Sequence, residues 1–287
     1  MSTPSINTSR QSASQPLVAP HKDRSWVGQV IWITGASSGI GAALARQWAA
    51  KGAILVLSAR RAALLHALQQ ELVNRTQHLV LPLDLNDAAA VELAVQQVLA
   101  QCGRVDWLIN NAGVSQRATI LQTQLATERQ IMELDYFAQI QLTRLVLPSM
   151  LTTKQGQVVF ISSVAGLVGT QYRAGYSAAK AALHMWANSL RAEHHSDGIF
   201  VATVFPGFVH TEVSQHALTG DGTALGSMDQ AQANAMTADQ FAAKTIKALA
   251  RRRQHIVIGG LKERFAAWLI GIAPSLLYRL IRRASVR

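Results

Sequence analysis

Two side chains of complementary acid–base chemistry, Tyr176 and Lys180, stand four residues apart. On a helix this spacing places both side chains on one face. A phenol can give a proton to a carbonyl oxygen or take one from a hydroxyl, but a free phenol holds its proton too tightly to be a good base at neutral pH. A nearby ammonium favours the phenolate. The pair therefore predicts proton transfer at a carbonyl or an alcohol, with a chance pair on an amphipathic helix as the alternative.

A glycine-rich stretch, TGASSGIG, runs from Thr34 to Gly41. It follows an apolar run at 30–34 and opens a helix-like segment at 40–51. Glycines in such a turn let the backbone approach a pyrophosphate, and the helix N-terminus offers free N–H groups to phosphate. Turns and caps also use glycine, so the strand–turn–helix context carries the prediction of a dinucleotide site.

The elements that must position these residues follow a regular alternation. Apolar, β-branched runs predict strands at 30–34, 54–58, 79–83, 105–110, 157–162, 200–204 and 256–258. Longer Ala-, Leu- and Gln-rich stretches between them predict helices near 40–51, 61–74, 87–101, 127–152, 175–196 and 238–251. Because most of the strands are apolar throughout, both faces of the sheet should be covered. The alternation predicts an α/β fold, a doubly wound (Rossmann), mostly parallel seven-stranded sheet with helices on both faces.

Four motifs in this order resemble the short-chain dehydrogenase/reductase family. They are the T-G-x-x-x-G-x-G of Thr34 to Gly41, Asn110 to Gly113 after the fourth strand, the Y-x-x-x-K of Tyr176 to Lys180, and Pro206-Gly207 followed by Val209 and Thr211. The resemblance covers about residues 28–260. It implies an oxidoreductase that passes a hydride between a nicotinamide and a carbonyl or secondary alcohol.

The resemblance also implies which residues bind the cofactor. They are Gly35, Ser37, Ser38, Gly39, Ile40, Gly41, Asp84, Leu85, Asn110, Ala112, Gly113, Tyr176, Lys180, Pro206, Gly207, Val209 and Thr211. For Asp84 the alternative is a simple turn residue.

The residues at the end of the second strand should determine whether the chain binds NAD or NADP. An acidic residue there binds the ribose 2′-hydroxyl of NAD, whereas an arginine accommodates the 2′-phosphate of NADP. The chain has no acid at this point, and Arg60 and Arg61 follow the strand. Guanidinium groups meet phosphate with paired hydrogen bonds, so NADP(H) is the predicted cofactor. The alternative is a solvated arginine pair at the start of a helix.

In the family, a serine before the tyrosine holds the substrate oxygen, and the lysine also holds the nicotinamide ribose. Ser163 lies 13 residues before Tyr176 and matches that serine, with Ser162 as a structural alternative. Asp135 departs from the pattern, because the family has an asparagine there that helps to hold a water linking the lysine to solvent. An ionised Asp135 would alter the field around Lys180 and puts that proton relay in doubt.

Composition excludes several classes of protein. Hydrophobic residues make up 49% of the 287 residues and charged residues 15%, which excludes a wholly disordered chain. One cysteine, Cys102, allows neither an intrachain disulfide nor a cysteine-rich zinc site, and the histidines form no metal-binding pattern. The net charge of +11 raises nucleic acid as a partner, but neither zinc-finger spacing nor an aromatic strand pair supports one.

The basic charge is concentrated in a C-terminal extension, residues 261–287. From Arg251 onward there are nine Lys or Arg and one acid, Glu263. At the other end, residues 1–25 are rich in Ser, Thr, Gln and Pro and predict a flexible arm. That arm lacks the apolar run of a secretory signal, so a cytoplasmic protein is expected. Residues 28–260 form the single predicted domain between the two.

The extension has two alternative roles. Its uncharged stretch, 265–278, is shorter than the about 20 residues of a spanning helix, and Pro274 predicts a break followed by a second short helix. On that second helix one face is apolar and the other basic, as in helices that lie in a membrane interface. One alternative is peripheral contact with the inner face of a membrane. The other is packing on the same domain or across a dimer, covering the pocket.

The expected substrate is apolar, because apolar residues such as Leu167 and Val168 precede Tyr176 and should line its pocket with Gln171, Tyr172 and Arg173. A lipid-, steroid- or retinoid-like compound fits this lining. The alternatives are a 3-ketoacyl-thioester reductase and, favoured only by Asp135, a non-catalytic NADP-binding redox-sensing scaffold. The resemblance implies a dimer or tetramer that pairs through helices 127–152 and 175–196.

Overall fold

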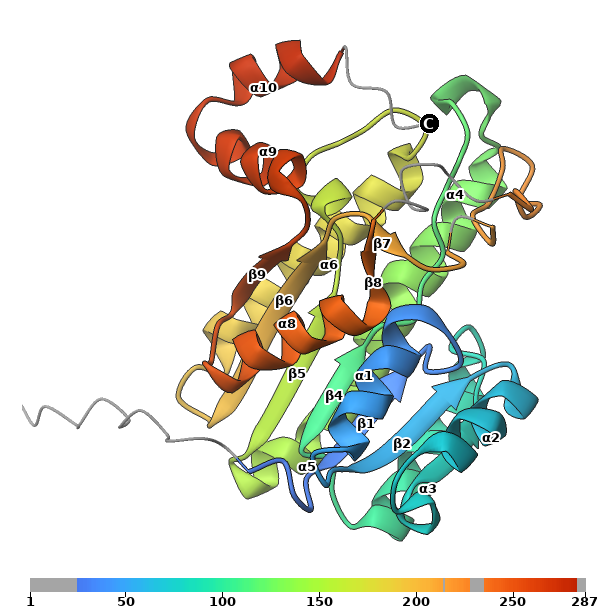
Figure 1. Cartoon of the computed structure of the whole chain (residues 1–287), viewed down its shortest axis with the longest axis vertical. Coiled ribbons are helices and arrows are strands. Elements are labelled where there is room, and N and C mark those ends of the chain that lie inside the picture. The colour runs from blue at the N-terminus through green and yellow to red at the C-terminus, as the bar shows by residue number, and fades with distance from the viewer. Residues whose placement is uncertain (1–24, 214, 228–234, 283–287) are drawn as a thin grey trace, which may run out of the picture.

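The apolar, β-branched runs form the strands of one sheet, as the alternation predicts. In the computed structural model, which describes residues 25–213, 215–227 and 235–282, seven parallel strands follow the order β3-β2-β1-β4-β5-β6-β9 (Figure 1). Their bounds are β1 Val30–Thr34, β2 Ile54–Ala59, β3 Leu79–Pro82, β4 Trp107–Asn110, β5 Gly156–Ile161, β6 Ile199–Pro206 and β9 His255–Ile258. The doubly wound fold is confirmed. The predicted arm, 1–25, lies outside the described residues except for Ser25.

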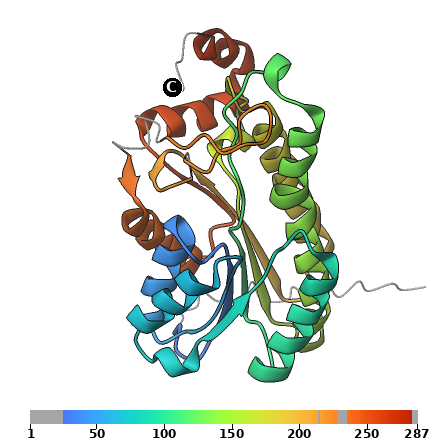
Figure 2. The ribbon, with the colours of Figure 1, turned by 90° about the vertical axis from the view of Figure 1, so that its right-hand side faces the viewer.

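Helices cover both faces of this sheet (Figure 2). Their bounds are α1 Gly39–Ala49, α2 Ala62–Glu71, α3 Ala88–Cys102, α4 Leu125–Met132, α5 Ala138–Thr153, α6 Ala174–Glu193 and α8 Ala238–Ala250. The side chains of α1, α2 and α8, such as Trp48 and Phe241, pack on one face. Those of α3, α5 and α6, such as Leu142 and Leu183, pack on the other. Burial on both faces explains why the strands are apolar throughout.

The strand order brings the carboxyl ends of all the strands to one edge of the sheet. Because all seven strands are parallel, their carboxyl ends meet at the same edge. The chain winds outward from β1 in both directions, with β2 on one side and β4 on the other. At such a reversal the loops diverge and leave a crevice beyond the carboxyl ends. The loops after β1, β2, β4, β5 and β6, which carry the predicted site residues, meet there.

The helix predicted at 127–152 is interrupted. Helix α4 ends at Met132, the π-helical turn Glu133–Phe137 follows, and α5 begins at Ala138. A π-helical turn inserts one extra residue into a helix, often at a functional site. The helical segment predicted at 127–152 is confirmed, but the apolar periodicity of the sequence is too coarse to show the inserted residue, so the π-helical turn was not predicted. Asp135 lies on this turn.

Local signals mark the end of α1 and the start of α8. Gly52, just beyond α1, has a left-handed φ of +83°. Thr237 and Gln240 form the capping box that opens α8. A short parallel pair, β7 Val209–His210 with β8 Met236–Thr237, was not predicted, since two residues carry no periodicity.

The C-terminal extension forms two helices that lie beyond the carboxyl edge of the sheet (Figure 1). Helix α9 spans Leu261–Ile272, and α10 spans Pro274–Ile281 with Pro274 at its start, as the predicted break requires. Within the described ranges, no helix is long and apolar enough to cross a membrane.

Candidate active site

A cavity of about 780 Å³ lies at the carboxyl edge of the sheet, within the size range of small-molecule sites. It brings together all the predicted site residues except Gly41 and Asn110. Those lining it are Gly35, Ser37, Ser38, Gly39, Ile40, Arg60, Arg61, Asp84, Leu85, Ala112, Gly113, Asp135, Ser163, Tyr176, Lys180, Pro206, Gly207, Val209 and Thr211. Among the described residues, no three His, Cys, Asp or Glu side chains are grouped closely enough to hold a metal ion.

The glycine loop has no room for a side chain at Gly35 or Gly41. Gly35 has a left-handed φ of +65°, and a Cβ there would lie 2.9 Å from the Cα of Ala112. A Cβ on Gly41 would collide with the carbonyl oxygen of Gly35. Gly41 therefore packs α1 against the loop, outside the cavity, while the loop backbone itself is left bare toward the cavity at the N-terminus of α1. A bare backbone at a helix N-terminus fits the pyrophosphate of a dinucleotide.

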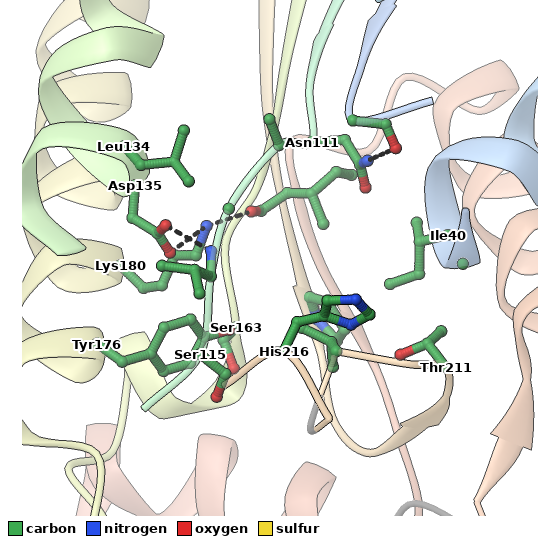
Figure 3. A pocket seen from close by; sticks show the side chains of 18 of the residues that line it. Ile40, Asn111, Ser115, Leu134, Asp135, Ser163, Tyr176, Lys180, Thr211 and His216 are labelled. Atoms are coloured by element: carbon green, nitrogen blue, oxygen red, sulfur yellow. Dashed lines mark hydrogen bonds and ion pairs between the residues drawn. The ribbon is translucent and has the colours of Figure 1, made fainter. Parts of the chain in front are cut away.

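The loop after β4 is joined to Thr34 and Gly35 by four hydrogen bonds. The Thr34 hydroxyl accepts from the backbone N–H groups of Asn111 and Ala112, at 3.0 and 3.1 Å. The Asn111 amide donates to the Thr34 carbonyl at 2.9 Å and to the Gly35 carbonyl at 3.3 Å. Asn111 lines the cavity (Figure 3), and sequence reasoning missed it in favour of its neighbour. The neighbour, Asn110, is buried and donates to the Thr143 hydroxyl at 2.9 Å, away from the cavity.

The two arginines after β2 lie on the rim of the cavity beside this loop. The Arg61 guanidinium donates to the hydroxyls of Ser38 and Ser37, at 2.9 and 3.2 Å. A positive charge therefore stands across the glycine loop. Asp84 also lines the cavity, while its carboxylate accepts from the backbone N–H of Asn86 at 3.0 Å, as a turn residue does.

Helix α6 carries Tyr176 and Lys180 on its cavity face (Figure 3). The Lys180 ammonium lies 5.8 Å from the centre of the Tyr176 ring. Lys180 is only 3% exposed, and its ammonium donates to the carbonyl of Ile161 at the end of β5, at 3.3 Å. A buried ammonium this close to the phenol can stabilise a phenolate.

The two adjacent serines after β5, Ser162 and Ser163, make different hydrogen bonds. The Ser162 hydroxyl donates to the backbone carbonyl of Lys180 at 3.0 Å and so holds α6 against the sheet. The Ser163 hydroxyl accepts from the N–H of Ala165 at 3.1 Å and caps the short 3₁₀ turn Val164–Gly166. Because the hydroxyl of Ser163 lines the cavity near Tyr176 and keeps its own proton, it can still donate to a substrate oxygen (Figure 3).

The carboxylate of Asp135 faces Lys180 from the π-helical turn (Figure 3). One oxygen accepts from the backbone N–H of Val114 at 2.8 Å, and the other lies 3.2 Å from the Lys180 ammonium. Asp135 is fully buried, and this burial raises the pKa of its carboxyl, against the opposing effect of the Lys180 charge. Gly113 passes close to the pair, since a Cβ there would lie 3.0 Å from the ammonium nitrogen.

Comparison with known proteins identifies the family to which the chain belongs. Residues 29–221 match the family described as short chain dehydrogenase. This chain belongs to the short-chain dehydrogenase family. It is 40% identical over 260 residues to the dehydrogenase/reductase SDR family member 7B of Xenopus laevis, covering 88% of this chain and 80% of that protein.

Two solved structures of the family share the fold. A short-chain dehydrogenase from Sphingobium yanoikuyae in complex with NADPH is 30% identical, with a TM-score of 0.70 over 90% of this chain and 98% of that one. A family member from Burkholderia phymatum in complex with NAD is 22% identical, with a TM-score of 0.78 over 88% of this chain and 96% of that one. As a family member, the chain is an oxidoreductase that works with a nicotinamide cofactor.

The far wall of the cavity comes from the C-terminal helices. Ala266 of α9 and Ile281 of α10 line it. Their neighbours Leu269 and Leu277 are buried against Val168. The inner face of the α9–α10 pair is therefore packed on the domain and covers the substrate side. Lys262 and Glu263 also line the cavity, and sequence reasoning missed both, because no motif marks a residue that only tertiary packing brings to a site.

Proposed function

We propose that this chain is an NADP(H)-dependent oxidoreductase that acts on a carbonyl or secondary alcohol of an apolar substrate. The observation that carries the proposal is one continuous cavity: the glycine loop with Arg61 forms one end, and Tyr176, Lys180 and Ser163 lie on its wall. Such an arrangement supports acid–base catalysis by positioned groups.

A bound nicotinamide supplies or accepts the hydride. In the reducing direction, the Tyr176 hydroxyl gives its proton to the substrate oxygen, and the Lys180 ammonium stabilises the phenolate left behind. The Ser163 hydroxyl donates a hydrogen bond to the same oxygen and holds it in place. In the oxidising direction, Tyr176 takes the proton from the alcohol.

The proposed preference for NADP rests on Arg60 and Arg61. Both line the cavity at its glycine-loop end, and the Arg61 guanidinium already contacts Ser37 and Ser38. The solved relative with NADPH supports this preference, although another family member is solved with NAD. The backbone N–H groups of the glycine loop would hold the cofactor. Asp84 and Leu85, which line the same cavity, would also contact it.

The proposed apolar substrate rests on the far wall of the cavity. Val168, Leu218, Ala266 and Ile281 contribute apolar surface there. A long hydrocarbon ketone or aldehyde of the lipid, steroid or retinoid type suits this wall better than a small polar metabolite. A 3-ketoacyl thioester, the alternative, carries a similar acyl chain and has to be compared directly.

The test is a screen for NADPH consumption across apolar ketones, apolar aldehydes and 3-ketoacyl thioesters. We expect turnover with apolar carbonyls, and a higher kcat/KM for them than for thioesters of equal chain length. Higher kcat/KM for the thioesters would favour the alternative substrate. Binding of NADPH without turnover of any carbonyl would favour the redox-sensing scaffold.

We further propose that the outer face of the α9–α10 pair contacts an anionic lipid surface. Phe265 and Trp268 are 51% and 58% exposed, and Leu276, Tyr278 and Leu280 of α10 are about half exposed. The exposed side chains of Arg264 and Arg279 lie on the same two helices, and Arg282 follows α10 directly. Exposed apolar and aromatic side chains accompanied by cations are typical of an interfacial surface.

Vesicle co-sedimentation tests this contact. We expect the protein to sediment with phosphatidylserine vesicles at low salt and less at high salt. The double variant Phe265→Ser/Trp268→Ser should stay in the supernatant. Leu93→Ser, which removes a 65% exposed leucine from α3, is the matched control and should sediment normally. A double variant that still sediments would show that another surface binds.

We also propose a homodimer or homotetramer that pairs through the outer faces around α5 and α6. Met185 of α6 is 57% exposed and Phe137, just before α5, is 48% exposed. Large exposed apolar side chains of this kind mark candidate interfaces. Analytical ultracentrifugation should show a dimer or larger species, and Met185→Glu should shift it toward the monomer. A native protein that sediments as a monomer at micromolar concentration would contradict the proposal.

A further inference from the structure

The pair formed by Asp135 and Lys180 is unusual in its charge. The resemblance described above implies an asparagine, which is uncharged, at the position of Asp135. Here the Lys180 ammonium faces a fully buried carboxylate at 3.2 Å. The other carboxylate oxygen is fixed by the Val114 N–H, so the side chain is held in this orientation.

We propose that Asp135 is a positioning residue that balances part of the charge of Lys180 beside Tyr176 and so sets the pH range over which Tyr176 acts as a proton donor. This inference rests on the proposed roles of Tyr176 and Lys180. It concerns the pH dependence of the reaction, which those roles alone leave open.

The interaction among Asp135, Lys180 and Tyr176 is electrostatic. A lone ammonium 5.8 Å from the phenol ring favours the phenolate, because the full positive charge acts on it through a poorly polarisable interior. A carboxylate in contact with that ammonium cancels much of the charge as seen from the ring. The phenol then holds its proton to a higher pH and remains a proton donor, which is the form that reduction needs.

The pair is in contact with Tyr176 of α6, with the Ile161 carbonyl of β5 and with the Val114 N–H. Other charged or titratable side chains of the same cavity wall are Arg117, Arg173, His216, Lys262 and Glu263. The Arg117 guanidinium donates to the Ser115 hydroxyl and the Gln116 carbonyl, and that of Arg173 lies over the Phe208 ring. Because burial raises the pKa of Asp135, acidification should protonate its carboxylate and weaken the charge balance.

The decisive variant is Asp135→Asn. Its amide oxygen can keep the Val114 hydrogen bond, and its NH₂ group then faces the ammonium without cancelling the charge. We expect the midpoint of the pH profile of kcat for alcohol oxidation to move down by about 0.5–1 pH unit.

Glu133→Gln is the matched control. It removes one negative charge from an exposed position on the same π-helical turn and should leave the midpoint unchanged. Asp135→Ser is the second variant, since it is neutral, keeps an acceptor near Val114 and presents no NH₂ group to Lys180. It should show the same downward shift, so the proposal stays testable if Asp135→Asn folds poorly.

The inference would be contradicted if the pH midpoint of kcat for alcohol oxidation were the same in the native enzyme and in those of Asp135→Asn and Asp135→Ser that fold. If activity still depends on Tyr176 in that case, the charge-balance role is wrong and the proposed catalytic function stands. If Tyr176→Phe leaves the native activity unchanged, the proposed function itself fails, and with it this inference. A midpoint that moves upward would also overturn the inference.

Discussion

The two ends of the cavity are built in different ways. The cofactor end is made largely of backbone: bare glycines, a helix N-terminus, and loops joined by Thr34 and Asn111. The substrate end is made of side chains from segments far apart in the chain, such as Val168, Leu218 and Ile281. Close backbone contacts demand glycine at fixed positions and so leave a motif, whereas an apolar wall accepts many side chains. The first end can therefore be predicted from sequence, whereas for the second the sequence indicated Val168 near Tyr176 but not Leu218 or Ile281.

Among the variants that affect only one end of the cavity, the largest effect is expected at the cofactor end. In Gly41→Ala the added Cβ meets the Gly35 carbonyl, so α1 and the glycine loop must separate. We expect NADPH affinity to fall by about 30- to 100-fold, or about 2–3 kcal/mol. Fluorescence titration measures it. Gly271→Ala, where a Cβ meets nothing within 4 Å, is the control and should bind normally. Normal binding by Gly41→Ala would show that the loop does not depend on bare backbone.

The next variant breaks the substrate end. Leu277→Asp places a carboxylate where a side chain of α10 is buried, 3% exposed, against α9 and Val168. We expect the KM for an apolar carbonyl to rise about tenfold, through loss of about 1.4 kcal/mol of binding, with NADPH affinity unchanged. Leu276→Asp, at a neighbouring position that is 48% exposed, should change KM little. Equal KM values for both variants would mean that α10 does not form the wall.

The proposed preference for NADP rests on side chains at the cofactor end. We expect the native protein to bind NADPH at least about tenfold more tightly than NADH, or about 1.4 kcal/mol. Arg61→Ala should narrow this difference most, because Arg61 contacts Ser37 and Ser38, and Arg60→Ala should narrow it less. NADH affinity should stay nearly constant in both. Equal native affinities for the two cofactors would refute the predicted preference.

The smallest effect lies outside both ends of the cavity, at the sheet edge. Burial and the neighbouring charges of His255 and Arg191 lower the pKa of His184 to about 4. Between about pH 6.5 and 4 the unfolded chain then binds a proton that the folded chain does not, so the free energy of unfolding falls as pH drops through this range. His184→Leu should reduce this acid destabilisation by about 1–2 kcal/mol. Denaturant unfolding at pH 7 and pH 4.5 measures it, and an unchanged pH dependence would contradict the assignment.

The difference between the two ends of the cavity also explains which features of the fold and site could be predicted from sequence. The strands, Tyr176 with Lys180, and the glycine loop follow from periodicity and spacing. The π-helical turn at Asp135 does not, because one inserted residue leaves no periodic trace. Sequence also could not show that Asn111, and not Asn110, reaches the cavity, because this depends on the direction of each side chain at the end of the strand. Lys262 and Glu263 reach it through the packing of α9, which no local pattern encodes.

Replacement of Tyr176 by Phe tests the proposed proton transfer most directly. The change removes one hydroxyl and leaves the ring beside Lys180, so thermal stability and NADPH affinity should stay at native values. With an apolar carbonyl identified in the screen, kcat/KM should fall by at least about 100-fold. A variant that binds NADPH normally and keeps most of its native kcat/KM would contradict Tyr176 as the proton donor.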